Sequence, residues 1–307
     1  MDFNLAINQI LILFIIMFIG LAAKKQKMID ENVQSSISAI LVKIGLPALV
    51  LASSNFERNN QVLPNMLQIL YITLIYYVAI ASLGIITAKL LKYKKQTAKV
   101  YTSLIVFANV GFMGYPVARA FFQETGVFYA SIVNLVFTAL LWTYGILLFN
   151  SQDRINFKKL VNIGTITAVI NIIIFLSGYK LPTAIFTALD MTGKMTIPLA
   201  MIFIGATIAD INFKNLLNDK KVYIVSILRL LIIPITTGFL LKTAGFNSTV
   251  ISICTIMAAM PSAATNAIFA REFNSEPLFA SVGVFITTLL SIISLPLNIY
   301  ILTHFVL

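Results

Sequence analysis

Cysteine, histidine, tryptophan and charged residues are all scarce in this sequence. Of its 307 residues, one is cysteine, one is histidine and one is tryptophan, and only 11% are charged. A single cysteine, Cys254, excludes an intramolecular disulfide framework and any metal site built from several cysteines. The single histidine, His304, lies near the end of the sequence given, which argues against a histidine dyad or a histidine-ligated metal within a membrane.

Motifs of common enzymes are also missing. The sequence contains no Gly-x-x-x-x-Gly-Lys-Ser/Thr loop, which excludes ATP hydrolysis by a phosphate-binding loop of that kind. It contains no Gly-x-Ser-x-Gly nucleophile motif and no acidic pair in the middle of an apolar segment. The sequence therefore predicts a protein that is not an enzyme and that uses neither a cofactor nor a metal ion.

Apolar residues, in contrast, make up 59% of the chain, against roughly 45–50% in soluble domains. The mean hydropathy is +0.93. A transmembrane helix needs about 20 apolar residues, and the chain offers ten such segments. We therefore expect an all-α polytopic membrane protein with ten transmembrane helices. The segments fall at 5–23, 34–54, 64–91, 97–124, 127–149, 160–178, 183–209, 219–241, 247–273 and 277–306.

The net charge is +11, and the basic residues behind it are unevenly distributed among the predicted loops. With the N-terminus outside, the predicted inner loops hold fifteen lysines and arginines and the outer loops hold four. Because cytoplasmic loops collect basic residues, this split predicts a cell-membrane protein whose two termini are both extracytoplasmic, and it removes the need for a nucleic-acid partner. Three basic residues, Lys43, Lys194 and Arg229, lie well inside the predicted helices and not near a loop.

Two short motifs recur at a nearly constant distance. Lys-x-x-x-Pro occurs at 43–47 and 194–198, and Ala-Arg-x-Phe occurs at 118–121 and 270–273. The matches fall in the second and fourth members of two sets of five predicted helices. Because five is odd, the second copy enters the membrane from the opposite side, which is the inverted-repeat architecture of many secondary transporters. The predicted repeats are residues 1–150 and 151–307.

The fourth and ninth predicted helices are interrupted near the middle of the bilayer. The first interruption, at 109–116, holds two glycines and a proline, and the second, at 260–266, holds a proline and three polar residues. Twenty helical residues, from Lys99 to Arg119, span about 30 Å, so their midpoint is Asn109; counting back from Arg271 gives Pro261. Half-helix N-termini at such breaks carry N–H groups and positive dipole ends suited to a carboxylate.

Together these motifs, with the segment 194–206, resemble the auxin efflux carrier family, which includes plant PIN-type carriers and bacterial proteins described as malate permeases. The resemblance implies scaffold and transport domains each built from both inverted repeats. It implies broken helices 4 and 9 that cross near a carboxylate site, as in bile acid-sodium symporter-like and NhaA-like architectures. It also implies transport of organic anions, often outward. Plant members carry a long loop between helices five and six, whereas only residues 150–159 intervene here, which argues against auxin itself as the natural substrate.

We expect the interruptions at 109–116 and 260–266, together with the two intramembrane lysines, to form the substrate site. For the two asparagines the alternative is that each only caps backbone groups. For Lys194 the alternative is an ion pair with Asp190, four residues earlier, and for Lys43 it is snorkelling to the interface. The predicted substrate-binding residues are Asn109, Gly111, Tyr115, Pro116, Pro261, Ser262, Thr265, Asn266, Lys43 and Lys194. The predicted hinge residues are Gly111, Gly114, Pro116 and Pro261, and Asp210 is a candidate for ion coupling.

The sequence thus predicts a secondary active or facilitative transporter of small carboxylates, malate-like or auxin-like, that works by alternating access. A sodium-coupled organic-anion symporter of similar fold is the alternative, followed by a passive channel and by a sensor that transports nothing. The sequence leaves open coupling to H+ or Na+, the direction of transport and the oligomeric state, a homodimer included.

Overall fold

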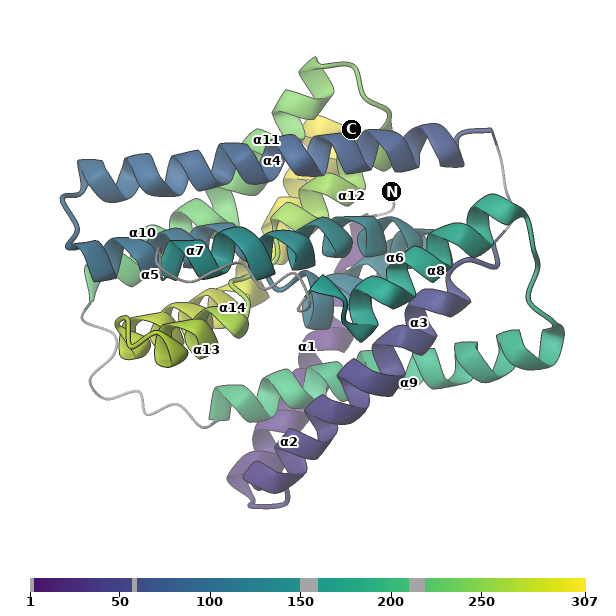
Figure 1. The fold of residues 1–307 in the computed structure, drawn as a ribbon, viewed down its shortest axis with the longest axis horizontal. Coiled ribbons are helices and arrows are strands. Elements are labelled where there is room, and N and C mark those ends of the chain that lie inside the picture. The colour runs from purple at the N-terminus through teal and green to yellow at the C-terminus, as the bar shows by residue number, and fades with distance from the viewer. Residues whose placement is uncertain (1–2, 57–59, 150–159, 210–218) are drawn as a thin grey trace.

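The computed structural model describes residues 3–56, 60–149, 160–209 and 219–307. Within these ranges every regular element is a helix, as Figure 1 shows, and the sole β-type pairing is an isolated antiparallel bridge between Ala108 and Ser262. Seven helical stretches in the described residues are long and apolar enough to cross a membrane. The prediction of an all-helical fold with several candidate spans is confirmed, and the number ten stays a prediction.

The first half of the chain runs from Phe3 to Phe149. Asp30 accepts a hydrogen bond from the backbone N–H of Val33 and so caps the start of the second helix. Short π-helical turns, labelled η, interrupt several of the helices. The elements are α1 (Phe3–Lys25), α2 (Glu31–Ile40), η1 (Leu41–Gly45), α3 (Leu46–Ala52), α4 (Val62–Leu90), α5 (Lys95–Val106), η2 (Val110–Gly114), α6 (Tyr115–Leu140), η3 (Leu141–Gly145) and α7 (Ile146–Phe149).

In the second half, asparagine and aspartate caps again mark where helices begin. Asn162 caps α8 in a capping box with Thr165, Asp219 caps α10, and Asn247 caps α12. The elements are α8 (Ile163–Ser177), α9 (Thr183–Ala209), α10 (Lys220–Ile227), η6 (Leu228–Ile232), α11 (Ile233–Thr243), α12 (Ser248–Ala258), α13 (Thr265–Glu272), α14 (Pro277–Ile301) and η7 (Leu302–Val306).

Three of the π-helical turns precede a proline by the same distance. Pro47, Pro116 and Pro234 each stand two residues after the end of η1, η2 and η6. Proline has no N–H to donate and its ring crowds the preceding turn, so a wider turn before it relieves both problems. The same turns carry or adjoin the intramembrane polar residues Lys43, Asn109 and Arg229.

The forty-residue candidate span Val110–Phe149 is not one straight helix. Gln123, inside α6, has φ 51° and ψ −135°, which no helix interior allows. The chain therefore turns at Gln123, next to the gap between the segments predicted at 97–124 and 127–149. The stretch therefore consists of two helical pieces that are joined at Gln123.

Glycines allow one group of helices to pack closely. Gly20 on α1 contacts the backbone of Ile202 on α9, and Gly205 on α9 contacts the backbone of Met17 on α1, so neither position has room for a Cβ atom. On the same helix, Gly193 lies against the backbone of Leu49 in α3. These contacts join α1, α3 and α9 into one group, to which α8 adds through α3.

The remaining long helices form the other side of the molecule. Figure 1 shows α4 and α9 along opposite edges, with α5, α6 and α12 between them. Most residues of α5, α6 and α12 are buried, whereas α4 exposes large apolar side chains such as Val78 and Leu90. An outer face rich in exposed apolar side chains is what a lipid-facing helix requires.

Candidate functional site

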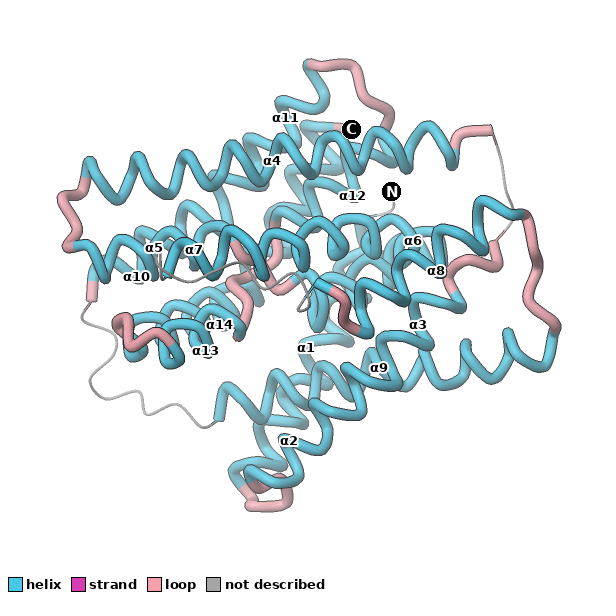
Figure 2. Tube along the Cα trace, in the orientation of Figure 1, coloured by secondary structure: helices cyan, strands magenta, loops and turns pink. Residues whose placement is uncertain are grey.

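Two non-helical segments meet inside the protein. Helix α5 ends at Val106, after which Phe107 is extended, and α12 ends at Ala258, after which the chain leaves the helix through a turn at Ala259. The N–H of Asn109 donates to the carbonyl of Pro261 at 2.7 Å, and the N–H of Ala263 donates to the carbonyl of Phe107 at 2.9 Å. Figure 2 shows such loop segments in the middle of the molecule as well as at the helix ends. The two interruptions predicted from the sequence are thus hydrogen-bonded to each other.

Side chains of the second segment strengthen this junction. The Ser262 hydroxyl donates to the Leu104 carbonyl at 2.7 Å, and the Asn266 amide donates to the carbonyls of Phe107 and Ala263, both at 2.9 Å. Ser262 and Asn266 are 0% and 1% exposed. Both residues therefore satisfy backbone carbonyls that the broken helices leave without helical partners. Neither lines the cavity described below.

Asn109 has a different role, because it caps the helix that follows it. Its side-chain oxygen accepts a hydrogen bond from the N–H of Phe112 at 3.1 Å, and its backbone carbonyl accepts one from the N–H of Gly114 at 3.0 Å. Gly114 lies close to α12, since a Cβ there would be 2.9 Å from the Met257 methyl group, whereas a Cβ on Gly111 would meet nothing closer than 3.9 Å. Close approach accounts for Gly114 but not for Gly111.

A cavity of about 340 Å³ opens beside Asn109. Its wall is formed by η1 and α3 on one side and by η2, α6 and the start of α13 on the other, and the start of α8 completes it. Of the predicted site residues, four line this cavity: Asn109, Gly111, Tyr115 and Thr265. Other polar or aromatic residues in its wall are Phe112, Asn134, Phe137, Thr138, Trp142, Asn162 and Thr167.

The cavity wall contains no lysine or arginine, but it contains the starts of helices. Three helices start at it: the η2–α6 helix after Asn109, α13 at Thr265, and α8 after Asn162. The first N–H groups of a helix have no partner within it, and each helix N-terminus carries about half a positive charge. The site is therefore suited to a small anion whose remaining surface is apolar.

Sequence reasoning missed three of the lining polar groups. Asn134 hydrogen-bonds the hydroxyl of Tyr115, Asn162 caps α8, and Trp142 lies in η3. Asn134 is a polar residue within an apolar segment, and that signal could have identified it, since such residues cost free energy unless they have a partner or a role. Asn162 stands near the start of the predicted segment 160–178, where nothing distinguishes it from an ordinary cap residue. Trp142 lies within the predicted segment 127–149, where a large apolar ring needs no functional reason.

Several predicted site residues lie elsewhere. Pro116, Pro261, Lys43 and Lys194 are not among the residues lining the cavity. Lys43 lies in η1 with an exposed side chain, and no described residue pairs with it. Lys194 forms an ion pair with Asp190 at 2.6 Å, which is the structural alternative that its spacing offered. Asp210 lies outside the described residues.

The pair of Lys194 and Asp190 belongs to a larger charged cluster. One guanidinium nitrogen of Arg119 lies 3.0 Å from a carboxylate oxygen of Asp190 and 3.0 Å from one of Glu124. The Arg119 and Asp190 side chains are 10% and 14% exposed, so solvent screens this pair weakly. The cluster links α6, beside its break at Gln123, to α9 across the boundary between the two helix groups.

We expect Asp190 and Arg119 to be energetically coupled. Because Asp190→Asn leaves Arg119 with Glu124 as its single ion-pair partner among the described residues, a double-mutant cycle with Arg119→Gln should give a coupling free energy of about 1 kcal/mol. Thermal unfolding in detergent measures it. Lys242→Gln, on an exposed side chain outside the cluster, is the matched control and should not couple to Asp190→Asn.

Within the described part of the chain, no three histidine, cysteine, aspartate or glutamate side chains are grouped so as to hold a metal ion. Among the buried polar and charged residues of this part of the chain, Arg229 is the one with a charge and is 0% exposed, and the others are serines, threonines and asparagines.

The sequence model of one family, described as "Membrane transport protein", matches residues 5–158 and 153–299. Among similar proteins, a Methanothermobacter thermautotrophicus protein described as an uncharacterized transporter is 27% identical over 300 residues, 94% of this chain and 96% of its own. A Methanocaldococcus jannaschii uncharacterized transporter is 26% identical over 303 residues, with the same shares covered. An Escherichia coli K12 uncharacterized transporter is 20% identical over 312 residues, 96% of this chain and 97% of its own.

Proposed function

Because the chain belongs to the membrane transport protein family, it is a transporter, and we propose that it carries small organic anions, with the anion bound in the cavity beside Asn109. The membership also confirms the resemblance to auxin efflux carriers seen in the sequence. The observation that carries the proposal is the convergence of three helix N-termini on one cavity without a carboxylate in its wall. An anion gains from these dipole ends, whereas a cation is repelled by them.

The cavity further supports a monocarboxylate with an apolar body over a dicarboxylate. Most of its wall is aliphatic or aromatic, including Phe112, Phe137 and Trp142, and its polar groups are amides and hydroxyls. Burying a second carboxylate of a malate-like molecule needs a second charge partner, because a buried, unpaired charge is costly. No lysine or arginine side chain lines the cavity. An auxin-like ligand, with one carboxylate and a ring, meets both the positive ends and the apolar wall.

The proposed architecture is ten helices in two inverted repeats. The break at Gln123 divides one candidate span in two, and the apolar helices α8 and α12 are shorter than the other spans. The seven long spans become eight when the one broken at Gln123 is counted as two. Helix α8, and α12 together with α13, bring the number to ten. Hydrogen bonds between the breaks of the two halves support a crossing at which Asn109 faces the anion.

Alternating access then becomes a movement between two helix groups. The proposed scaffold is α1, α2, α3, α8 and α9, and the proposed transport domain holds the other helices; the cavity lies between them. With both termini outside the cell, the cluster of Arg119 and Asp190 lies on the outer side of the membrane and closes the path from the cavity to that side. The cavity reaches the start of α8 on the inner side, so the described conformation corresponds to an inward-facing state.

The proposal is tested by binding and by flux. Trp142 is the one tryptophan of the chain and lines the cavity, so a ligand there should change the intrinsic fluorescence of the purified protein. We expect phenylacetate, which has no indole ring of its own, to produce a saturable change and malate to produce a much smaller one. Trp142→Phe should remove the signal. Counterflow of radiolabelled phenylacetate in proteoliposomes should saturate with concentration, as a carrier requires and a channel does not.

Flux without saturation would contradict the carrier mechanism. Tight binding and transport of malate, with none of phenylacetate, would contradict the preference for an apolar monoanion while leaving the transport of organic anions standing. If no carboxylate changes the fluorescence of Trp142 or exchanges across the membrane, the proposed site is wrong.

A further inference from the structure

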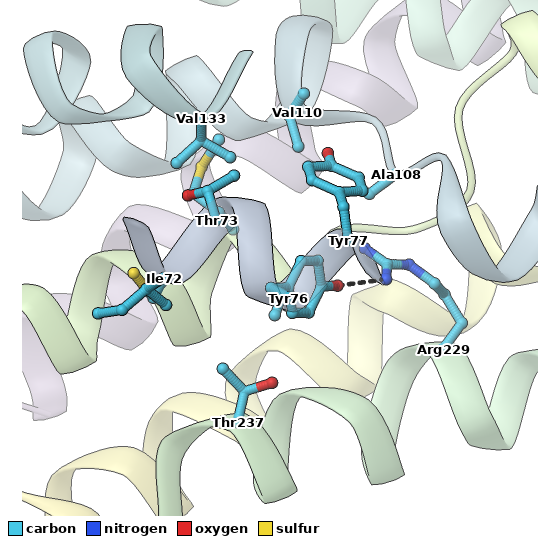
Figure 3. Close-up of a pocket in the computed structure, with 12 residues that line it drawn as sticks. Ile72, Thr73, Tyr76, Tyr77, Ala108, Val110, Val133, Arg229 and Thr237 are labelled. Atoms are coloured by element: carbon cyan, nitrogen blue, oxygen red, sulfur yellow. Dashed lines mark hydrogen bonds between the residues drawn. The ribbon is translucent and has the colours of Figure 1, made fainter. Parts of the chain in front are cut away.

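Arg229 is the largest fully buried side chain of the described structure, and the carrier proposal has no role for it so far. It lies in the π-helical turn η6, between α10 and α11, five residues before Pro234. Figure 3 shows its guanidinium directed at the hydroxyl of Tyr76 on α4. A buried guanidinium needs hydrogen bonds and a compensating negative charge, because its desolvation is costly.

The hydrogen bonds of Arg229 go to the junction of the two broken helices. Its Nε donates to the carbonyl of Met260 at 3.0 Å, and one terminal nitrogen donates to the carbonyl of Ile105 at 3.3 Å and to the Tyr76 hydroxyl at 2.8 Å. Ile105 belongs to the last turn of α5, and Met260 follows the end of α12. Arg229 therefore binds both half-helices at their C-terminal ends.

The positive charge of Arg229 matches the partial negative charges of the two helix ends. Each helix C-terminus carries about −0.5 of an elementary charge, so the two ends together amount to about −1, and one guanidinium offsets them. No carboxylate pairs with Arg229 anywhere in the described residues. The helix ends themselves are thus its counter-charge.

The position of Arg229 matters because one backbone segment, at Ala108, lies between the substrate cavity and the small cavity beside Arg229. Ala108 lines the substrate cavity beside Asn109 and also the small cavity, of about 20 Å³, that Arg229 and Tyr76 line. The N-termini of the half-helices that follow the two breaks face the first cavity, and the C-termini of the half-helices that precede the breaks face Arg229. In transporters with broken helices, unwound carbonyls and half-helix C-termini are the groups that coordinate a coupling cation.

We propose that the Arg229 guanidinium is a built-in cation that takes the place of a coupling ion at the junction of α5 and α12. This inference rests on the proposed carrier function only for its transport readout. It makes the chain independent of Na+, because a tethered charge already occupies the carbonyl ends that Na+ would bind. It also makes Arg229 a positioning residue, which holds the two breaks together without touching the substrate.

The decisive experiment removes the tethered cation and supplies a free one. Arg229→Ala should be less stable than the wild type, with phenylacetate counterflow reduced at least about tenfold, as loss of two helix-end interactions predicts. Guanidinium ion at about 10 mM should restore part of the thermal stability and of the flux to Arg229→Ala, but not change the wild type, as selective binding to the folded state requires. Choline at the same concentration should restore neither.

Matched variants separate charge from structure. Arg229→Lys keeps the charge and should retain more stability and flux than Arg229→Gln, which keeps hydrogen-bonding capacity but loses the charge. Arg271→Gln removes one positive charge from an exposed position on α13. It should leave stability, flux and their independence of Na+ unchanged. Wild-type unfolding temperature and flux should be equal in NaCl and in N-methyl-D-glucamine chloride.

Three results would overturn the inference. The first is a wild type whose unfolding temperature or flux requires Na+. The second is an Arg229→Ala protein that is folded and unaffected by guanidinium ion. The third, which applies even if Arg229→Ala does not fold, is equal behaviour of Arg229→Lys and Arg229→Gln. Because the unfolding temperature needs no substrate, these results remain informative if no carboxylate is transported, and absence of flux would then count against the proposed function alone.

Discussion

Replacing Asn109 with alanine is expected to abolish carboxylate counterflow. The change removes the cap that accepts the N–H of Phe112, and it removes the amide that lines the cavity at the start of η2. A lost N-cap costs about 1 kcal/mol of stability. A lost hydrogen bond to a charged ligand costs about 1.5–3 kcal/mol, which is roughly 10- to 150-fold in affinity. Proteoliposome counterflow of phenylacetate and Trp142 fluorescence measure the two losses.

Two variants distinguish capping from ligand binding. Asn109→Asp keeps a good helix cap but places a carboxylate beside the anion, so the protein should keep its unfolding temperature and lose binding. Asn247→Ala removes a cap of the same chemistry, the one that accepts the N–H of Val250 at 3.1 Å, from a helix start outside the cavity. It should lower stability and keep binding. Binding by Asn109→Asp equal to that of the wild type would show that Asn109 acts only as a cap.

The largest loss of stability is expected from Gly205→Ala. A Cβ at this position of α9 would overlap the Met17 carbonyl of α1 and would lie 2.8 Å from the Leu21 nitrogen. Backbone atoms cannot rotate away as a side chain can, so the two helices must separate. Overpacking of a well-packed interior costs about 1–3 kcal/mol, and separation of two helices along this contact belongs at or above the top of that range.

The measurement is the unfolding temperature in detergent together with the monodispersity of the purified protein. Gly111→Ala is the matched control, since its Cβ has no neighbour closer than 3.9 Å and should not lower the unfolding temperature. A Gly205→Ala protein as stable as the wild type would mean that α1 and α9 are not packed as closely as described.

The sequence was most informative where a residue type restricts the backbone. Prolines and glycines within apolar segments located both interruptions, and the asparagine that begins the first of them does cap a helix. These features depend on a few neighbouring residues, so a short pattern is enough to predict them. The bounds of long apolar helices follow from composition in the same way: the segments predicted at 64–91 and 183–209 correspond to α4 and α9.

Contacts between distant segments could not be predicted. Lys194 and Asp190 were recognisable as neighbours, but nothing in their spacing reveals that Arg119 joins them from 71 residues away. The π-helical turns were not predicted either: in η1 the N–H of Leu46 bonds the carbonyl of Leu41, five residues back. Such a turn holds one extra residue and shifts the side chains that follow it out of the regular 3.6-residue period.

The Arg229 contacts show a further limit. Its lack of a nearby acidic residue was visible in the sequence, but its partners are the carbonyls of Met260 and Ile105, which carry no side-chain signature. Every residue has a carbonyl, so only the fold can identify which carbonyls are left without helical partners.

The hydrogen bonds that join the two breaks have an evolutionary consequence. They run between main-chain atoms, from Asn109 to Pro261 and from Ala263 to Phe107. Exchange of the side chains at 108 or 262 leaves these bonds in place, whereas proline at 263 would delete a donor. Selection can therefore let most side chains around the joint drift while the joint persists. Such tolerance is compatible with divergence to 20% identity across nearly full-length relatives.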